Sequence, residues 1–344
     1  MHADRFRPLL NTNGPFVSIY FDDSHDTADA ATQLDSRLRD IRKHLEEQAV
    51  EQSVIEAIDT AVRAKHPPVG RSGRCLIAAG PRIVLDEHLV QPPAGTQLRV
   101  SEDPYLVPIV EHGMLHTSYL LVAADHTGAD IEVHDGQSRA ETVEGSGHPV
   151  HKAHKADTAG YGGPQGRVDE AVRKNLREVA ERVTRLVDET GAGIVFLTGD
   201  ARTELAAELP ERVATKAVQV HGGGRAAGTD PAEVHRGIGE EFVKLRLAAL
   251  DDAATRFAAG HGAGLAVEGL AAVTAALRDG SVETLIIGDL GDQTVVGEQG
   301  VRRADEALPL LAVATGATLV RTDERLTPAD GIAAILRYAD PNVG

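Results

Sequence analysis

Aromatic residues and positive charge are both scarce in this 344-residue sequence. Tryptophan is absent, and Phe, Trp and Tyr together make up 3% of the chain, so base stacking on aromatic side chains is not expected to be its main mode of recognition. Lys and Arg number 35 against 52 Asp and Glu, which gives a formal net charge of -17. Neutralising phosphates requires Lys and Arg, so indiscriminate binding of nucleic acid is excluded and any RNA contact must be local and shape-directed.

Cysteine and long apolar runs are also nearly missing. The single cysteine, Cys75, can form no internal disulfide, and its apolar surroundings (RCLIAAG) indicate a buried strand thiol, not a nucleophile. No run of about eighteen apolar residues occurs, which disfavours a membrane-spanning helix. The first ten residues (MHADRFRPLL) lack the apolar region of a signal peptide, so we expect a cytoplasmic protein without membrane contact.

What is present is a pattern of strands alternating with amphipathic helices, typical of an α/β fold. The length allows two or three domains, and we place boundaries near residues 112 and 259. In residues 1–112 we predict strands over 16–21, 75–79 and 82–85, helices over 30–48 and 53–64, and a polar loop leading to Pro104.

The other two predicted domains show the same alternation. Residues 113–259 begin with a hairpin of 118–124 and 129–134, followed by strands over 193–198 and 217–220, a helix over 203–209, and a helix that opens at Asp230-Pro231. In residues 260–344 we predict a helix near 270–277, strands over 282–287 and 318–321, and a helix over 331–338. This last third has six Lys or Arg against twelve Asp or Glu, which favours a protein-binding domain over an RNA-binding one.

The middle of the chain inverts the overall sign of charge. From His148 to Val187 there are eight Lys or Arg and five Asp or Glu. The first part (HPVHKAHKADTAGYGGPQGR) is basic and rich in glycine, which suits close approach to phosphates or to another backbone. The second part predicts a long helix, because its apolar residues recur at steps of three and four. These are Val168, Val172, Leu176, Val179, Val183, Leu186 and Val187.

Much of the charge on this helix can be satisfied within the helix itself. Five pairs of opposite charge are spaced i,i+4, and each stabilises an isolated helix by only about 0.2 to 0.5 kcal/mol. The pairs are Asp169–Arg173, Glu170–Lys174, Arg177–Glu181, Glu178–Arg182 and Glu181–Arg185. A surplus remains around the loop, and we predict that it contacts RNA phosphates: His151, Lys152, Lys155, Arg167 and Arg173.

Two other motifs are weighed and set aside. Gly222 to Gly228 follows a predicted strand as a dinucleotide-binding loop would, but the next helix opens later, at Asp230-Pro231, so we predict an ordinary loop and no cofactor. His148, His151 and His154 have a spacing that could suggest metal binding. Because no second set of Cys or carboxylate ligands accompanies them, we predict no metal site and favour a hydrated or RNA-facing loop.

With these parts in order, the sequence resembles the archaeo-eukaryotic release factor and Pelota superfamily, in its bacterial branch, which includes the ribosome hibernation factor Balon. Gly162-Gly163-Pro164-Gln165 with Arg167 is similar to the Gly-Gly-Gln loop of those release factors, and His151-Lys152 resembles a His-Lys pair of bacterial members. The segment 270–290 (LAAVTAALRDGSVETLIIGDL) is similar to part of the family's C-terminal domain. The resemblance covers about residues 113–344, and residues 1–112 match only in general layout.

The resemblance implies three α/β domains in a release-factor-like and Pelota-like arrangement, the last of them similar to ribosomal protein L7Ae. It also implies a translation factor that occupies the A site of idle or stalled 70S ribosomes, as in hibernation or stress. The N-terminal domain would face the decoding centre, and the rRNA-binding residues would be His151, Lys152, Lys155, Gly162, Gly163, Gln165, Arg167 and Arg173. The C-terminal domain would contact a translational GTPase such as the elongation factor EF-Tu.

An enzymatic alternative stays open. Gly162 and Gly163 would let the backbone approach a peptidyl-tRNA ester and Gln165 would orient water, as in a release or rescue factor. However, Pro164 separates the second glycine from Gln165, and no Asn-Ile-Lys-Ser-like stop-codon loop occurs in residues 1–112. No catalytic residue is therefore assigned beyond these three candidates. A third possibility is a protein-interaction scaffold that makes no use of the loop.

Overall fold

The structure, a computed structural model, describes residues 1, 3–65, 70–114, 118–135, 138–147, 164–225, 231–297 and 300–339. They form a mixed α/β protein, as predicted from the sequence. The chain divides into two compact units, of which unit 1 combines Met1–Leu115 with Gly239–Gly344 and unit 2 is His116–Ile238. Among the described helices, none has both the length and the apolar character needed to cross a bilayer.

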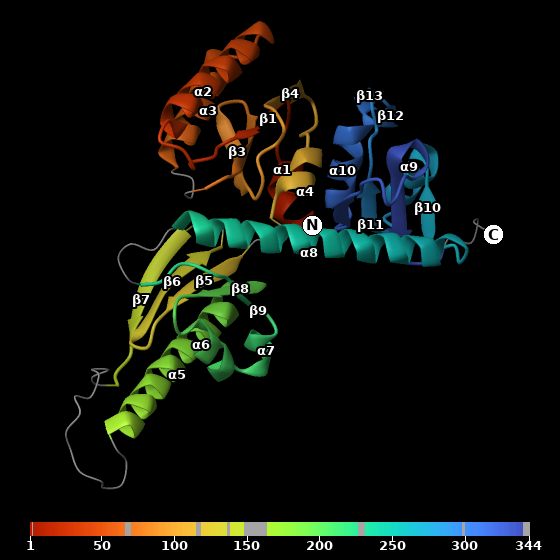
Figure 1. The fold of residues 1–344 in the computed structure, drawn as a ribbon. Coiled ribbons are helices and arrows are strands. Elements are labelled where there is room, and N and C mark those ends of the chain that lie inside the picture. Colours follow the sequence, from red (N-terminus) through yellow and green to blue (C-terminus); the bar gives the residue numbers. More distant parts are fainter. Residues whose placement is uncertain are drawn as a thin grey trace. The chain divides into compact units, whose positions relative to one another are not determined.

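The first part of unit 1 is built on an antiparallel sheet (Figure 1), and buried side chains on its two faces belong to two different cores. Its strand order is β3-β2-β1-β4, with β1 at Phe16–Asp22, β2 at Gly73–Ala79, β3 at Arg82–Leu89 and β4 at Gln97–Ser101. Successive side chains of a strand point to opposite faces. Val17, Ile19 and Phe21 accordingly pack against α2 (Ala30–Glu47) and α3 (Gln52–Ala64), whereas Phe16 and Tyr20 enter the other core.

The second part of unit 1 is built on a mixed sheet of order β10-β15-β11-β14. Only β11 and β14 pair in parallel. The strands are β10 (Ala266–Glu268), β11 (Val282–Ile287), β14 (Thr318–Arg321) and β15 (Ile332–Leu336), and the helices packed on the sheet are α9 (Leu270–Arg278) and α10 (Ala304–Ala314). A separate hairpin joins β12 (Thr294–Gly297) to β13 (Gly300–Arg303).

One hydrophobic core spans both parts of unit 1. Phe6 and Leu106, from the N-terminal part, belong to the same cluster of buried side chains as Leu277 and Leu308, from the C-terminal part. Shorter elements contribute to it, namely η1 (Ala3–Phe6), α1 (Arg7–Leu10) and α4 (Val107–His112). Residues predicted to lie in separate outer domains therefore pack together, and the division into three domains stays a prediction.

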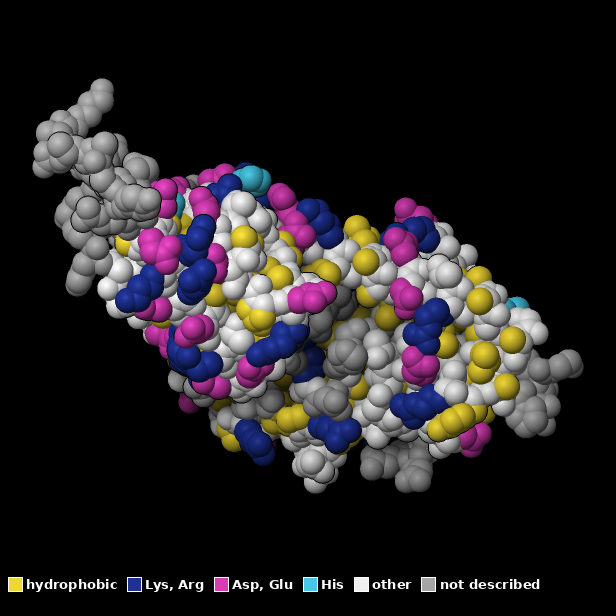
Figure 2. Space-filling model, turned by 90° about the horizontal axis from the view of Figure 1, so that it is seen from below, with side chains coloured by type: hydrophobic (Ala, Val, Ile, Leu, Met, Phe, Trp, Pro, Cys, Tyr) yellow, Lys and Arg dark blue, Asp and Glu magenta, His cyan; other side chains and the backbone are white. Residues whose placement is uncertain are grey.

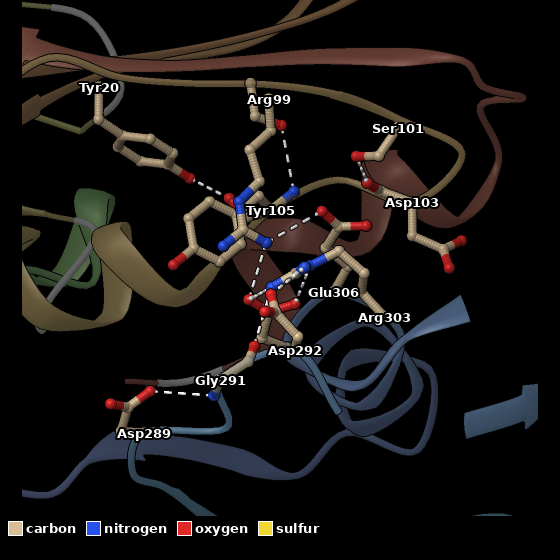
Figure 3. A network of polar contacts seen from close by, with 12 residues as sticks. Tyr20, Arg99, Ser101, Asp103, Tyr105, Asp289, Gly291, Asp292, Arg303 and Glu306 are labelled. Atoms are coloured by element: carbon tan, nitrogen blue, oxygen red, sulfur yellow. Dashed lines mark hydrogen bonds and ion pairs between the residues drawn. The ribbon is translucent and has the colours of Figure 1, made fainter. Parts of the chain in front are cut away.

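A polar network also links β4 to the start of α10 (Figure 3). The guanidinium of Arg99 donates to Asp305 at 2.7 Å and to Glu306 at 3.1 Å. It lies over the ring of Tyr105, 3.6 Å from the centroid. Arg303 donates to the same Asp305 at 3.1 Å. Both carboxylates are largely buried, so these cations compensate charges that water solvates poorly.

Unit 2 is a five-stranded sheet of order β7-β6-β5-β8-β9, with helices on it (Figure 1). Strands β5, β8 and β9 run in parallel, and β5, β6 and β7 form an antiparallel meander. The strands are β5 (Tyr119–Ala124), β6 (Gly128–His134), β7 (Ser138–Glu144), β8 (Ile194–Thr198) and β9 (Ala217–Gln219). The helices are α5 (Pro164–Thr190), α6 (Arg202–Glu208), α7 (Glu211–Ala214) and the first part of α8 (Pro231–His261). The predicted hairpin, both later strands and both helices are confirmed.

Two predictions about residues 1–112 and 260–344 are wrong. Residues 331–338 do not form a helix, because Ile332–Leu336 is the buried central strand β15, bonded to β10 and β11. The polar stretch before Pro104 contains strand β4, which pairs with β1 from Phe16 to Tyr20. The apolar run at 332–336 is too short for its periodicity to distinguish a strand from a buried helix. Strand β4 lies at the edge of its sheet and its side chains are half exposed, so its sequence resembles that of a polar loop.

Candidate functional site

The long helix α5 is fixed to unit 2 by its apolar stripe. Leu176, Val179, Val183, Leu186 and Val187 are all buried in one cluster with strands β5, β6 and β8, and Val172 packs at its edge. The stripe predicted from the sequence is therefore confirmed from Val172 onward, whereas Val168 is half-buried and lies outside the cluster. Because this face is buried, the opposite face of α5 is held toward solvent from Asp169 to Glu189.

The predicted site residues are only partly described by the structure. His148, His151, Lys152, His154, Lys155, Gly162 and Gly163 lie outside the described residues. Helix α5 begins at Pro164, which is common for proline, so the backbone of Gln165 and Arg167 belongs to its first turn. Their side chains are not among those described. Arg173 is exposed on the helix.

The ion pairs of α5 differ from the predicted i,i+4 pattern. Arg177 pairs with Glu208 of α6 at 3.2 Å, not with Glu181. Arg182 pairs with Glu141 of β7 at 2.6 Å and with Glu189 at 3.3 Å, not with Glu178. The hydrogen bond from Arg182 lowers the pKa of Glu141. These arginines pair with acids on neighbouring elements because α5 packs on the sheet and on α6. The spacing of charges along the helix does not reveal that packing.

Other cations of α5 have no such partner. Within the part of the chain that the structure describes, Arg173, Lys174 and Arg185 make no ion pair, and all three are exposed. Arg185 lies between two open surface grooves, one bordered by Arg177, Asp188 and Arg212 and the other by β7 and Arg182. Lys174 and Arg185 were not singled out from the sequence, where each had an acid four residues away.

The exposed face of α5 has no broad excess of positive charge. From Pro164 to Thr190 the helix has six Lys or Arg and six Asp or Glu, so the positive surplus of the region comes from particular unpaired cations and from residues before the helix. Figure 2 shows basic and acidic side chains intermingled over the face that it draws. Such a surface favours contacts with individual phosphates over a broad field of attraction.

The chain that precedes residue 148 is tied to α5. The amide of Gly147 donates to Oδ1 of the buried Asn175 at 2.8 Å, and Ser146 donates its amide to Glu178 at 2.8 Å. Hydrogen bonds from Ser146 lower the pKa of Glu178. Asn175 was missed in the sequence because one polar residue beside an apolar stripe carries no recognisable signal.

Of the motifs that were set aside, His148, His151, His154 and the end of the glycine loop, residues 226–228, lie outside the described residues. A Cβ atom added to Gly222 would lie 2.6 Å from the carboxylate of Glu233, and one added to Gly223 would lie 2.5 Å from Val234. These two glycines pack closely against the first turn of α8. Burial raises the pKa of the Cys75 thiol to about 12, so it is a poor nucleophile. Among the described residues, no cluster of three or more His, Cys, Asp or Glu could hold a metal ion.

Residues 118–263 match the model of the bacterial archaeo-eukaryotic release factor family 2. Two uncharacterized proteins of Mycobacterium tuberculosis, MT2704 (strain CDC 1551) and Rv2629 (strain H37Rv), are each 44% identical over 367 aligned residues. Each alignment covers 99% of this chain and 98% of the relative.

Solved structures of three proteins align with most of the chain. Archaeoglobus fulgidus Pelota is 15% identical with a TM-score of 0.36, covering 78% of this chain and 84% of its own. Dom34 of Saccharomyces cerevisiae is 10% identical with a TM-score of 0.39, covering 79% and 81%. The archaeal termination factor aRF1 is 16% identical with a TM-score of 0.26, covering 98% and 99%. From the family match over residues 118–263, the chain belongs to the bacterial archaeo-eukaryotic release factors, a bacterial branch of the release factor and Pelota superfamily.

Proposed function

We propose that this protein is a ribosome-associated translation factor that occupies the A site of idle or stalled 70S ribosomes, as a hibernation or stress factor does. Family membership supports the general class. Residues 148–163 and the exposed face of α5 would contact rRNA, with the previously named His151, Lys152, Lys155, Gly162, Gly163, Gln165, Arg167 and Arg173 joined by Lys174 and Arg185.

The observation that carries this proposal is that the two faces of α5 differ in burial and in charge. One face is buried in its own domain, and the other presents the exposed cations Arg173, Lys174 and Arg185, which form no ion pair within the described chain. Lys174 and Arg185 are eleven residues apart, close to three full turns, so they share one side of the helix about 16 Å apart. That distance matches contacts with two phosphates several nucleotides apart on one strand.

The acidic remainder of the protein fits the same proposal. A net charge of -17 opposes capture of free nucleic acid, whereas a preformed rRNA cleft can be entered with a few well-placed contacts. The acidic C-terminal third favours a protein partner, and we propose a translational GTPase such as EF-Tu. Pull-down of EF-Tu by the full chain, with and without ribosomes, would test this.

Cosedimentation with 70S ribosomes across a range of salt concentrations tests the ribosome contact. The double variant Lys174→Ala/Arg185→Ala should reduce the magnitude of the slope of log affinity against log salt by somewhat under about two units, at about 0.7 to 0.9 per phosphate contact. Arg177→Ala/Arg182→Ala is the matched control, since it removes the same charge from the same helix but only from residues already paired with Glu208 and Glu141. Equal effects of the two doubles would mean that net charge, not contact, controls affinity.

Occupancy of the A site is tested by competition. Aminoacyl-tRNA delivered to the A site should displace the protein, whereas tRNA in the P site should not. A protein that stays in the ribosome-free fractions of starved cells would disprove the proposal. The alternative, a peptidyl-tRNA hydrolase or rescue factor, predicts release of labelled peptide from ribosomes and loss of that turnover in Gln165→Ala.

A further inference from the structure

Every residue of the strap that leads to residue 148 is held by a hydrogen bond or ion pair. Glu144 pairs with Arg225, the amide of Gly145 donates to Thr127 O at 2.8 Å, and Ser146 and Gly147 donate to α5. Such complete pairing is usual within a sheet, but β7 ends at Glu144. The strap, residues 144–147, begins at the last residue of the ladder, Glu144, and its other three residues are fixed by contacts outside the ladder of strands.

Asn175 is the buried centre of these contacts. Its side chain is only 1% exposed, and both ends of its amide are satisfied, since Oδ1 accepts from Gly147 and Nδ2 donates to His126 O at 3.0 Å. Asn is a poor helix former, and burying its amide costs free energy unless it is hydrogen-bonded. The bonds join three segments, α5, the β5–β6 turn and the strap, which a hydrophobic residue at this position could not do.

Two glycines of the strap are needed for the approach to Asn175. A Cβ atom on Gly145 would lie 2.1 Å from Asn175 Oδ1, and one on Gly147 would lie 2.7 Å from the same atom and from Ala171 O. Both distances are well below contact distance, so any larger residue would push the strap away from α5. Glycine is required at both positions because the backbone of the strap lies directly against the side chain of Asn175.

We propose that Asn175 is a positioning residue, which fixes the point at which residues 148–163 leave the domain. The segment starts at Gly147 beside Asn175 and ends at Pro164, eleven residues earlier on α5, which is about 16 Å along the helix axis. The hydrogen bond at Gly147 and the start of α5 at Pro164 thus determine where the two ends of this segment lie, and a preset position of contacting residues lowers the cost of binding. The ribosomal consequence rests on the proposed function, whereas the fixing of the strap does not.

Hydrogen exchange and proteolysis test the structural part. In Asn175→Ala, protection of the Gly147 amide should fall by about tenfold or more, the factor that loss of one hydrogen bond implies. Protease cleavage within 148–163 should become faster, while exchange in β5 and β8 stays slow. In Gly145→Ala the added methyl group prevents the strap from approaching Asn175, so this variant should show the same loss of protection and the same faster cleavage. Thr184→Ala is the control, a polar-to-alanine change on α5 whose hydroxyl has no hydrogen-bond partner in the described chain.

Ribosome binding tests the functional part. It is measured at a temperature where Asn175→Ala and Asn175→Asp are both fully folded. Asn175→Ala should weaken affinity for 70S ribosomes by about tenfold, with an unchanged salt slope because no cation is lost. Asn175→Asp keeps the acceptor for Gly147 but loses the donor to His126, so its affinity should be intermediate. Unchanged protection and cleavage in Asn175→Ala would overturn the inference. Lost protection with unchanged affinity would overturn the functional part, and failure of the wild type to bind ribosomes would refute the proposed function alone.

Discussion

At the scale of single residues, the most unusual environment is that of Asp23. Its carboxylate is buried, and neither oxygen accepts a hydrogen bond within the described chain. The nearest cation, Arg74, is 3.7 Å away and is already held by Asp86 at 2.9 Å and 3.1 Å and by carbonyls of α3. Burial raises the pKa of Asp23 to about 6, and the attraction of Arg74 only partly opposes this rise.

This environment predicts that Asp23→Asn stabilises the protein at neutral pH. Since the folded-state pKa is about 6 against an ordinary 3.8, the folded form binds more protons between these values, and its stability falls as pH rises through this window. The asparagine variant lacks this loss, so urea unfolding should show a higher midpoint than the wild type at pH 7.5 and a smaller difference at pH 4, values chosen on either side of about 6. A lower midpoint at pH 7.5 would mean that attraction to Arg74 outweighs burial.

Leu176 gives a second prediction at this scale. It is 2% exposed in the core beneath α5, so Leu176→Ala should destabilise unit 2 by about 2 to 5 kcal/mol through lost burial and a cavity. Thermal unfolding followed by hydrogen exchange in β5 and β8 measures the loss. Arg173→Ala, on the exposed face, is the control and should change stability by less than about 0.5 kcal/mol.

At the scale of elements, β4 and α10 are joined by the Arg99 network. Asp305 retains Arg303 if Arg99 is removed, but the pair that Arg99 makes with Glu306 is lost, and Glu306 is 4% exposed. Burial raises the pKa of Glu306, and hydrogen bonding to Arg99 opposes the rise. Arg99 therefore favours the charged form of a carboxylate whose pKa is raised by burial.

Arg99→Ala should accordingly destabilise unit 1 by about 1 to 3 kcal/mol at neutral pH, the cost of leaving a buried charged group unpaired. The loss should shrink at acid pH, because protonation of Glu306 removes the uncompensated charge. Arg99→Lys should recover only part of it, since an ammonium lacks the planar fork and its stacking on Tyr105. If Arg99→Ala/Glu306→Gln is no more stable than Arg99→Ala, the unpaired carboxylate is not the cause.

At the scale of the whole molecule, the hydrophobic core of unit 1 draws on residues that are far apart in the chain. Phe6 and Leu106 share a cluster with Leu277 and Leu308, and all four are almost completely buried. Side chains in one close-packed core lose their contacts together. The N-terminal and C-terminal parts of unit 1 should therefore behave as one cooperative unit.

This organisation predicts that a core substitution in one part destabilises the other. Phe6→Ala should cost about 3 to 5 kcal/mol and should accelerate hydrogen exchange in β11, on the far side of the sequence, as well as in β1. Leu176→Ala should leave exchange in β11 unchanged, since it lies in unit 2. Acceleration confined to residues 1–115 would show that the two parts unfold independently.

Elements whose apolar residues recur regularly over a continuous stretch of the chain were predictable from the sequence. The stripe of α5, the hairpin of residues 119–134 and the buried strands at 194–198 and 282–287 all follow from repeated apolar residues at helical or strand spacing. The same is true of the resemblance that led to the family, because it rests on contiguous motifs. Charge composition likewise predicted that any basic site must be local.

The tertiary structure alone decided the partners of particular side chains. Arg177 and Arg182 found acids on α6 and β7, Ile332–Leu336 became a central strand, and Asn175 came to hold Gly147. Residues 1–115 and 239–344 were joined in one unit. In each case the stabilising contact comes from residues distant in sequence. Periodicity records only which face of an element is buried, and it does not identify the surface that buries it.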